Sequence, residues 1–248
     1  MLKISYTSIK ELININNKQG KKMKKLIIVT LAFMLGSFSM ASAELGVNVG
    51  FSGQMGAFVA NGTENEDTEQ HRGSAASIVG YGSVFVEKTL GSRLSVGVDY
   101  VPYALESETA QELRTDQVGA LATNVAVTNK IQVDFEDLTT LYAMLNLNEN
   151  FYIKAGVVSV DVLTNESLGT GSSYGNTSLD GNMYGAGYNQ KFDSGLFLRA
   201  EGNVMMFDGA SLTSTAACAT RVGTCASNVI KLEELNGVSG KISIGKSF

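Results

Sequence analysis

The chain has 248 residues and a formal net charge of −5, and it contains 27 glycines, 1 proline and 2 cysteines. This length fits a single all-β domain, and the composition excludes a disordered chain and a disulfide-dense scaffold. The first 43 residues hold seven of the 19 basic groups and one of the 24 acidic groups, which leaves 12 − 23 = −11 for residues 44–248. Such an acidic chain argues against nucleic acid as a partner, because nucleic acids bind to basic patches.

The amino-terminal segment has the layout of an export signal. Lysines at positions 21, 22, 24 and 25 precede the apolar stretch 26–38, which is followed by Ala41-Ser42-Ala43. This pattern predicts a signal-peptide helix that is cleaved before Glu44. The apolar stretch is too short for a membrane-spanning helix, which needs about 20 residues. We interpret Met23 as the true start, so residues 1–43 are an extension and a cleaved signal peptide.

Alternating apolar and polar residues dominate the mature domain, residues 44–248. This period of two is typical of strands with one apolar and one polar face. In the first strand, for example, Phe51 and Met55 share one face while Ser52 and Gln54 share the other. The sequence predicts eight such strands, at 45–59, 76–88, 94–100, 140–147, 151–158, 184–189, 196–206 and 229–248.

The predicted connections alternate in length. Short turns are expected at 89–92, 148–150 and 193–195, and long loops at 60–75, 106–130, 165–179 and 208–228. Short turns on one side and longer loops on the other, with an even number of strands, are typical of bacterial outer-membrane barrels. The sequence therefore predicts an all-β fold: an antiparallel eight-stranded up-and-down transmembrane β-barrel, preceded by the signal-peptide helix.

The last strand ends the chain on an aromatic residue, and Ile242, Ile244 and Phe248 share its apolar face. With the leader, the eight strands and the turn pattern, it resembles the small outer-membrane barrels of the OmpA/OmpX/OmpW type. The resemblance implies that the barrel-assembly machinery recognises these three residues. It also implies a place in the outer membrane of a Gram-negative bacterium, in contact with lipid and lipopolysaccharide. Lys246 departs from the family pattern, which usually has an apolar or aromatic residue there.

Charged residues within the strands fall on the more polar face. Because a lysine or arginine that faces lipid at mid-depth costs about 2–4 kcal/mol, we expect these charges to point into the barrel. An eight-stranded barrel has an interior just wide enough for side chains to fill it. We therefore expect ion pairs that fill the interior, with a polar conduit as the alternative. The predicted interior charges are Glu87, Arg93, Asp99, Lys154, Arg199, Glu201 and Lys241.

Aromatic residues gather near the predicted short turns. These residues are Phe151, Phe192, Phe197 and Phe248. Because aromatic girdles mark the interfaces of transmembrane barrels, we interpret these rings as an interfacial girdle.

Few residues suggest a catalytic, metal-binding or redox role. His71, the only histidine, lies in an acidic segment that lacks the spacing of a calcium loop and that we interpret as solvated. A hydrolase would have to use His71, and no G-x-S-x-G motif accompanies it. Cys218 and Cys225 lie in the last loop, where an exported chain is normally oxidised, so we predict a loop disulfide rather than a metal or redox site. No catalytic residue, cofactor or metal is predicted.

The sequence leaves three classes of function open. We expect a non-enzymatic barrel with a structural or surface-interaction role. The first alternative is a porin-like passive channel for small solutes, through the barrel or a lateral opening, which single-channel conductance would reveal. The second is a secreted soluble barrel that binds a small apolar ligand and needs no detergent for extraction.

Overall fold

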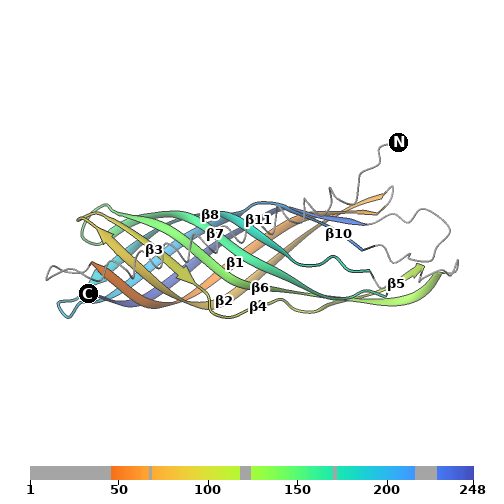
Figure 1. The fold of residues 1–248 in the computed structure, drawn as a ribbon, viewed down its shortest axis with the longest axis horizontal. Helices are drawn as coiled ribbons and strands as arrows, with labels where there is room; N and C mark the ends of the chain where they lie inside the picture. Colours follow the sequence, from red (N-terminus) through yellow and green to blue (C-terminus); the bar gives the residue numbers. More distant parts are fainter. Residues whose placement is uncertain (1–45, 67–68, 118–123, 170–171, 216–227) are drawn as a thin grey trace.

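The computed structural model describes residues 46–66, 69–117, 124–169, 172–215 and 228–248. These residues form one antiparallel sheet rolled into a long cylinder, with the carboxyl terminus at one end (Figure 1). Within them, no helix is long and apolar enough to cross a membrane. The strands are β1 (Val47–Glu66), β2 (Glu69–Leu90), β3 (Leu94–Tyr100), β4 (Leu105–Glu106), β5 (Ala110–Gln117), β6 (Asn124–Asn146), β7 (Phe151–Ser167), β8 (Thr177–Lys191), β9 (Leu196–Phe207), β10 (Ala210–Thr213) and β11 (Val229–Ser247).

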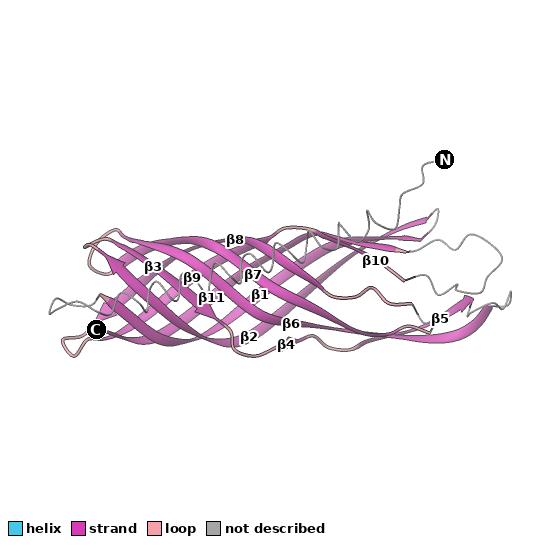
Figure 2. Ribbon diagram, viewed as in Figure 1, coloured by secondary structure: helices cyan, strands magenta, loops and turns pink. Residues whose placement is uncertain are grey.

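Pairing between the first and last strands closes the sheet. The strand order is β1-β2-β3-β6-β7-β8-β9-β11, and β11 returns to pair with β1. Where the sheet closes, Val47 and Phe248 exchange two backbone hydrogen bonds of 3.3 and 2.8 Å. The short strands β4 and β5 pair with β6, and β10 pairs with β11 (Figure 2). The predicted antiparallel eight-stranded barrel is confirmed, and every predicted strand is present.

The two ends of the barrel differ. Short turns join the strands at the end that holds the carboxyl terminus, which we call the turn end (Figure 1). At the opposite end, the hairpin end, the long loops predicted at 60–75 and 106–130 are wrong. There β1 and β2 continue to Glu66 and Glu69, and β6 already begins at Asn124. Residues 71–78 are exposed on both faces, so no apolar alternation revealed these extensions in the sequence.

In the half of the barrel nearest the turn end, large apolar side chains point outward. Burial alternates residue by residue along all of β9, and Phe51 and Met55 of β1 are 68% and 65% exposed. On a closed barrel, such an outward apolar surface is the lipid-facing band of a transmembrane barrel. This apolar band includes Phe51, Met55, Val59, Ile78, Leu145, Ile153, Val157, Leu196, Leu198, Val204, Met206, Val238, Ile242 and Ile244.

The pattern inverts in the half nearest the hairpin end. On β7, Val158, Val160 and Val162 point inward and are buried, whereas the intervening Ser159 and Asp161 are polar and only partly buried. This half is therefore built like a soluble barrel around its own apolar core, while the other half is built like a membrane barrel. The buried members of the internal apolar cluster are Tyr81, Val101, Leu138, Tyr142, Val158, Val160, Val162, Leu179, Met183, Met205 and Phe207.

The barrel wall is incomplete between β2 and β3. These strands pair only over residues Val84 to Leu90 of β2, although β2 itself starts at Glu69. Beyond Tyr100 the chain follows β6 instead, through β4 and β5. Within the described residues, β2 therefore has backbone pairing on one side only over residues 73–82, which we call the free edge.

A proline explains why the ladder stops. If the β2–β3 register continued, Pro102 would lie opposite Gly82, and proline lacks the N–H that the ladder requires. The Gly82 N–H donates instead to the hydroxyl of Tyr103.

Candidate functional site

The barrel interior contains six of the seven predicted charges. These six side chains come from β2, β3, β7, β9 and β11, and none is more than 8% exposed. They are Glu87, Asp99, Lys154, Arg199, Glu201 and Lys241. Arg93 lies in the turn between β2 and β3 and is exposed, so the structure corrects its assignment to the interior. The alternation that suggested it does not apply beyond the end of a strand.

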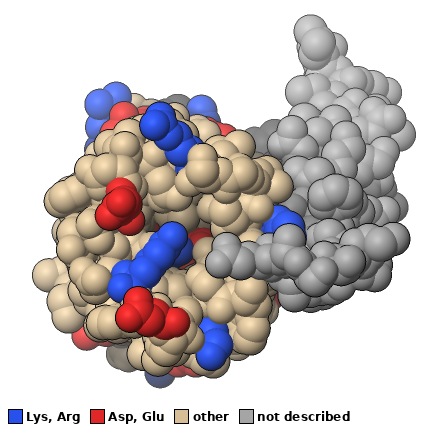
Figure 3. Space-filling view, turned by 90° about the vertical axis from the view of Figure 1, so that its left-hand side faces the viewer, with Lys and Arg blue, Asp and Glu red and all other residues tan. Residues whose placement is uncertain are grey.

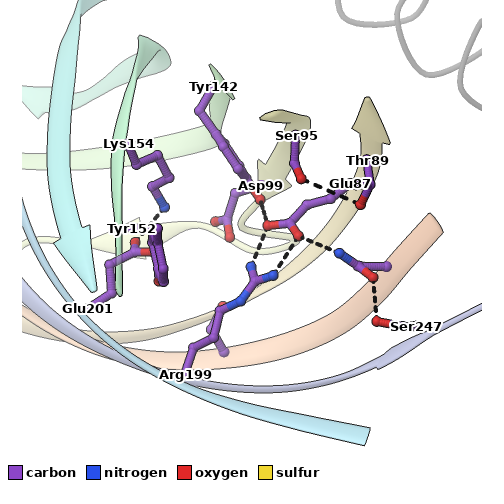
Figure 4. Close-up of polar contacts among 12 residues, drawn as sticks. Glu87, Thr89, Ser95, Asp99, Tyr142, Tyr152, Lys154, Arg199, Glu201 and Ser247 are labelled. Carbon is purple, nitrogen blue, oxygen red and sulfur yellow. Dashed lines mark hydrogen bonds and ion pairs between the residues drawn. The ribbon is translucent and has the colours of Figure 1, made fainter. Parts of the chain in front are cut away.

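The deepest ion pair joins Arg199 to Glu87, which is 0% exposed. Both terminal nitrogens of Arg199 donate to the carboxylate, with 2.7 Å between Nη2 and Oε2 (Figure 4). The Tyr142 hydroxyl donates to Oε1 at 2.7 Å, and Asn48 Nδ2 donates to Oε2 at 3.1 Å. Each carboxylate oxygen thus accepts two hydrogen bonds, which is the compensation that a buried charge requires.

Aromatic rings surround the Arg199 guanidinium. Its Cζ lies 4.5 Å from the ring centroid of Phe197, 5.5 Å from that of Phe85 and 5.7 Å from that of Tyr152. Rings at these distances attract the cation through their negative faces. Phe197 is 1% exposed, so its assignment to an interfacial girdle is wrong. Phe197 and Arg199 are two residues apart on one strand, and this shared parity places the ring inside.

Two further ion pairs bridge the interior. Lys154 pairs with Glu201, whose second carboxylate oxygen accepts a hydrogen bond of 2.7 Å from the Tyr152 hydroxyl. Lys241 pairs with Asp99. The three pairs link β2 to β9, β7 to β9 and β3 to β11, and in no pair are the two strands neighbours in the sheet. Each pair therefore braces walls that share no backbone hydrogen bonds.

A small cavity with both polar and apolar lining lies beside two of the ion pairs. Its lining includes Gln54, Tyr81 and Asn203, together with the Lys154–Glu201 and Lys241–Asp99 pairs. Its volume is about 10 Å³, which is room for about one water. Tyr81 Oη and Asn203 Oδ1 have no hydrogen-bond partner among the described residues, and a water would supply one.

Packing fills the interior on both sides of this cavity. Towards the turn end lie Arg199, Glu87 and the rings of Phe85 and Phe197. Towards the hairpin end lies most of the internal apolar cluster, although its member Tyr142 contacts Glu87. Beyond it, the Tyr174 hydroxyl between β7 and β8 donates to Glu64 of β1 at 3.1 Å. This packed interior is suited to a rigid barrel rather than to the passage of solutes.

The remaining predictions divide between the exposed surface and the undescribed residues. His71 lies on the exposed part of β2. Residues 1–43, Cys218 and Cys225 lie outside the described residues. Within the described ranges, no three His, Cys, Asp or Glu side chains gather as a metal site. Over the turn end, positive and negative side chains are interspersed rather than gathered by sign (Figure 3).

The carboxyl-terminal strand presents its apolar residues to the outside. Ile242, Ile244 and Phe248 are 62%, 52% and 54% exposed. Backbone pairing holds β11 between β1 and β9, and the Lys246 ammonium lies 5.9 Å from the Phe248 ring centroid. A role of these residues in assembly stays a prediction.

Comparison with known proteins bears on architecture alone. No protein-family model matches the chain, and no curated protein matches it. It is similar to the outer membrane protein OprG from Pseudomonas aeruginosa, with 9% identity, a TM-score of 0.45 and coverage of 84% of this chain and 99% of that one. It is also similar to the outer membrane protein AlkL in lipid bilayers, with 11% identity, a TM-score of 0.47 and coverage of 85% of this chain and 93% of that one. A third similar structure is the outer membrane protease OmpT from Escherichia coli, with 10% identity, a TM-score of 0.42 and coverage of 86% of this chain and 100% of that one. At this level of likeness no activity or ligand passes to the chain, whose barrel is shown by its own closed sheet.

Proposed function

We propose that the chain is a non-enzymatic outer-membrane barrel with a structural or surface-interaction role. The observation that carries this proposal is the filled interior. Six buried charges pair across the barrel, aromatic rings and an apolar cluster pack on either side of them, and the cavity left between them has room for about one water. An interior of this kind supports rigidity rather than solute passage.

The two halves of the barrel suggest its surroundings. The apolar band favours contact with acyl chains. The half nearest the hairpin end has a polar exterior, so it would stand in the aqueous layer beside lipopolysaccharide. The proposal includes export by the signal peptide in a Gram-negative bacterium and recognition of Ile242, Ile244 and Phe248 by the barrel-assembly machinery.

The non-enzymatic part of the proposal rests on how the ionisable groups are used. Each of the six buried charges has an opposite charge as its partner. His71 lies on the exposed part of β2 and is not among these buried charges.

Planar-bilayer recording of the purified, folded protein tests the proposal. We expect no reproducible single-channel steps, while the same sample shows the heat-dependent gel migration of a folded barrel. Discrete steps from this sample would favour the porin-like channel instead. Extraction of the mature protein from cells without detergent would favour the soluble ligand-binding barrel.

A further inference from the structure

We propose that the free edge of β2, residues 73–82, docks an extended peptide segment of another envelope protein, which adds to the barrel sheet as one more strand. This inference names a partner class for the surface-interaction role proposed above, and it rests on that role.

The direction of the backbone groups on the free edge follows from one hydrogen bond. The Gly82 N–H donates to Tyr103, so it points away from β1 and into the gap in the wall. In an antiparallel strand, the N–H and C=O of one residue point to the same side, and successive residues alternate. Ala76, Ile78 and Gly80 therefore direct their backbone groups into the gap, while the odd-numbered residues bond to β1.

Part of the free edge lies at the depth of the lipid. Gly80 is paired with Met55. Ile78 and Val238 are both paired with Ala57, one from each side of β1. Met55, Ile78 and Val238 are 65%, 75% and 57% exposed and belong to the apolar band. In hydrocarbon an unpaired backbone group costs several kcal/mol, and an open edge is tolerated at that depth only where protein buries it or where it lines a water-filled cavity. An added strand would satisfy the backbone of Ile78 and Gly80 in the first of these ways.

The edge also lacks the features that normally prevent strand addition. Proteins protect exposed edges with lysine, proline, bulges or inward charges. From Gly73 to Val86 the sequence contains no charged residue and no proline, and the β1–β2 register shows no bulge over this range. The free edge is therefore a regular template for main-chain hydrogen bonding.

A second copy of the chain does not fit this template. Two barrels that stand in one membrane with the same orientation tilt their facing strands in opposite directions. With a tilt of about 35–45° per barrel, the two strands would cross at roughly 70–90°, so they could not form a ladder. A separate extended segment has no such constraint, and strand addition of this kind draws its affinity from main-chain hydrogen bonds.

The opposite rim of the gap indicates the chemistry of the segment. Continuing the β2–β3 register would place Glu106 opposite Ile78 and Glu108 opposite Ala76, and both glutamates are exposed. A segment lying in the gap would meet small and apolar side chains on one rim and carboxylates on the other. We therefore assign to the partner an extended segment of small or apolar residues that carries lysine or arginine where it faces Glu106 and Glu108.

Residue-resolved hydrogen exchange tests this proposal. Exchange is measured by NMR on the full mature protein in native outer-membrane preparations and after purification into phospholipid vesicles. We expect the amides of Ala76, Ile78 and Gly80 to exchange at least tenfold more slowly in native membranes. The amides of Ser77 and Val79, which bond to β1, should exchange at the same rate in both preparations. This alternation distinguishes strand pairing from general shielding.

Two variants at one position identify the site. Gly80→Pro removes an N–H that points into the gap, so it should abolish the extra protection of Ala76 and Ile78 in native membranes. Gly80→Ala keeps the N–H, and a Cβ there meets only the Gln54 carbonyl oxygen at 4.0 Å, so it should keep that protection. The wild-type comparison decides the proposal even if Gly80→Pro does not fold.

Equal exchange in the two preparations would overturn the proposal. Fast exchange in both would show a hydrated lateral opening, and slow exchange in both would show an edge that is satisfied within the chain or by lipid. Either result leaves the bilayer recording unaffected, so failure of this inference is distinguishable from failure of the proposed function.

Discussion

Arg199 and Glu87 are 112 positions apart in the sequence, yet they form a bidentate ion pair across the barrel interior. The strands that carry them, β9 and β2, are not neighbours in the sheet. The pair therefore ties together two walls that the backbone ladder connects only around the circumference. Its surroundings of aromatic rings and two further donors make it the best-supported polar contact in the interior.

Arg199→Ala should lower the free energy of unfolding by about 3–5 kcal/mol, because it leaves the Glu87 carboxylate buried without its counter-charge. Urea unfolding of the protein in phospholipid vesicles, followed by gel migration, measures the change. Arg93→Ala is the control, since Arg93 is exposed in a turn and its loss should change stability by less than about 0.5 kcal/mol. Equal effects of the two substitutions would contradict a structural role for the buried pair.

A double-mutant cycle should show that Lys154 and Glu201 act together. Lys154→Ala, Glu201→Ala and the double variant are compared with the wild type by the same unfolding assay. For groups in direct contact, the double variant should deviate from the sum of the single effects by about 0.5–3 kcal/mol. Additive effects would mean that the two side chains contribute independently.

Tyr103→Phe should destabilise the barrel near the gap. It removes the acceptor of the Gly82 N–H, and a hydrogen bond of this kind contributes about 0.5–1.5 kcal/mol. Amide exchange at Gly82 should accelerate. Tyr184→Phe, at an outward tyrosine that is 51% exposed, is the control and should have little effect. Unchanged exchange at Gly82 would show that the hydroxyl is dispensable.

Ile242→Lys should impair insertion into lipid. The residue is 62% exposed in the apolar band, and a lysine that faces the middle of a bilayer costs about 2–4 kcal/mol. Folding yield and stability in vesicles measure the effect. Glu234→Lys, on an exposed part of β11 nearer the hairpin end, should be close to neutral. A neutral Ile242→Lys would place this face in water rather than in lipid.

Phe248→Ala should reduce assembly in cells several-fold, while the refolded protein keeps its stability within about 1 kcal/mol. The backbone of residue 248 still pairs with Val47, so the side chain is free to serve recognition. The amount of heat-modifiable barrel in isolated outer membranes measures assembly. Phe192→Ala, also an exposed phenylalanine in a turn, should assemble normally. Equal losses would point to interfacial anchoring instead of recognition.

The sequence predicted the membrane-spanning part of each strand because the side chains that face lipid must be apolar, and these recur at every second position. Ile242 and Ile244 must face outward, so Lys241, which precedes Ile242, must face inward. The extensions at the hairpin end follow no such rule, since residues 71–78 are exposed on both faces. There the strands are stabilised by pairing with neighbours, and that pairing leaves little trace in hydrophobic patterning.

The partners of the interior charges were not predictable. Arg199 and Glu201 share one face of one strand, and spacing alone does not tell that Arg199 pairs with Glu87 while Glu201 pairs with Lys154. The choice depends on the stagger and closure of the barrel, which set the side chains that meet across the axis. The aromatic surroundings of Arg199 could be predicted in part, because Phe197 is two residues away on the same strand and so faces the same side.

The inversion of hydrophobicity along β7 has a mechanical consequence. From Val157 to Ser167 the strand advances ten residues beyond the lipid-facing band, which at about 3.3 Å per residue and a tilt near 40° is roughly 25 Å along the barrel axis. The internal apolar cluster fills the first part of this section, up to Val162, so the shape of the barrel there is supported from inside and not by the bilayer alone. Whatever meets the hairpin tips therefore meets them at a set height above the lipid surface.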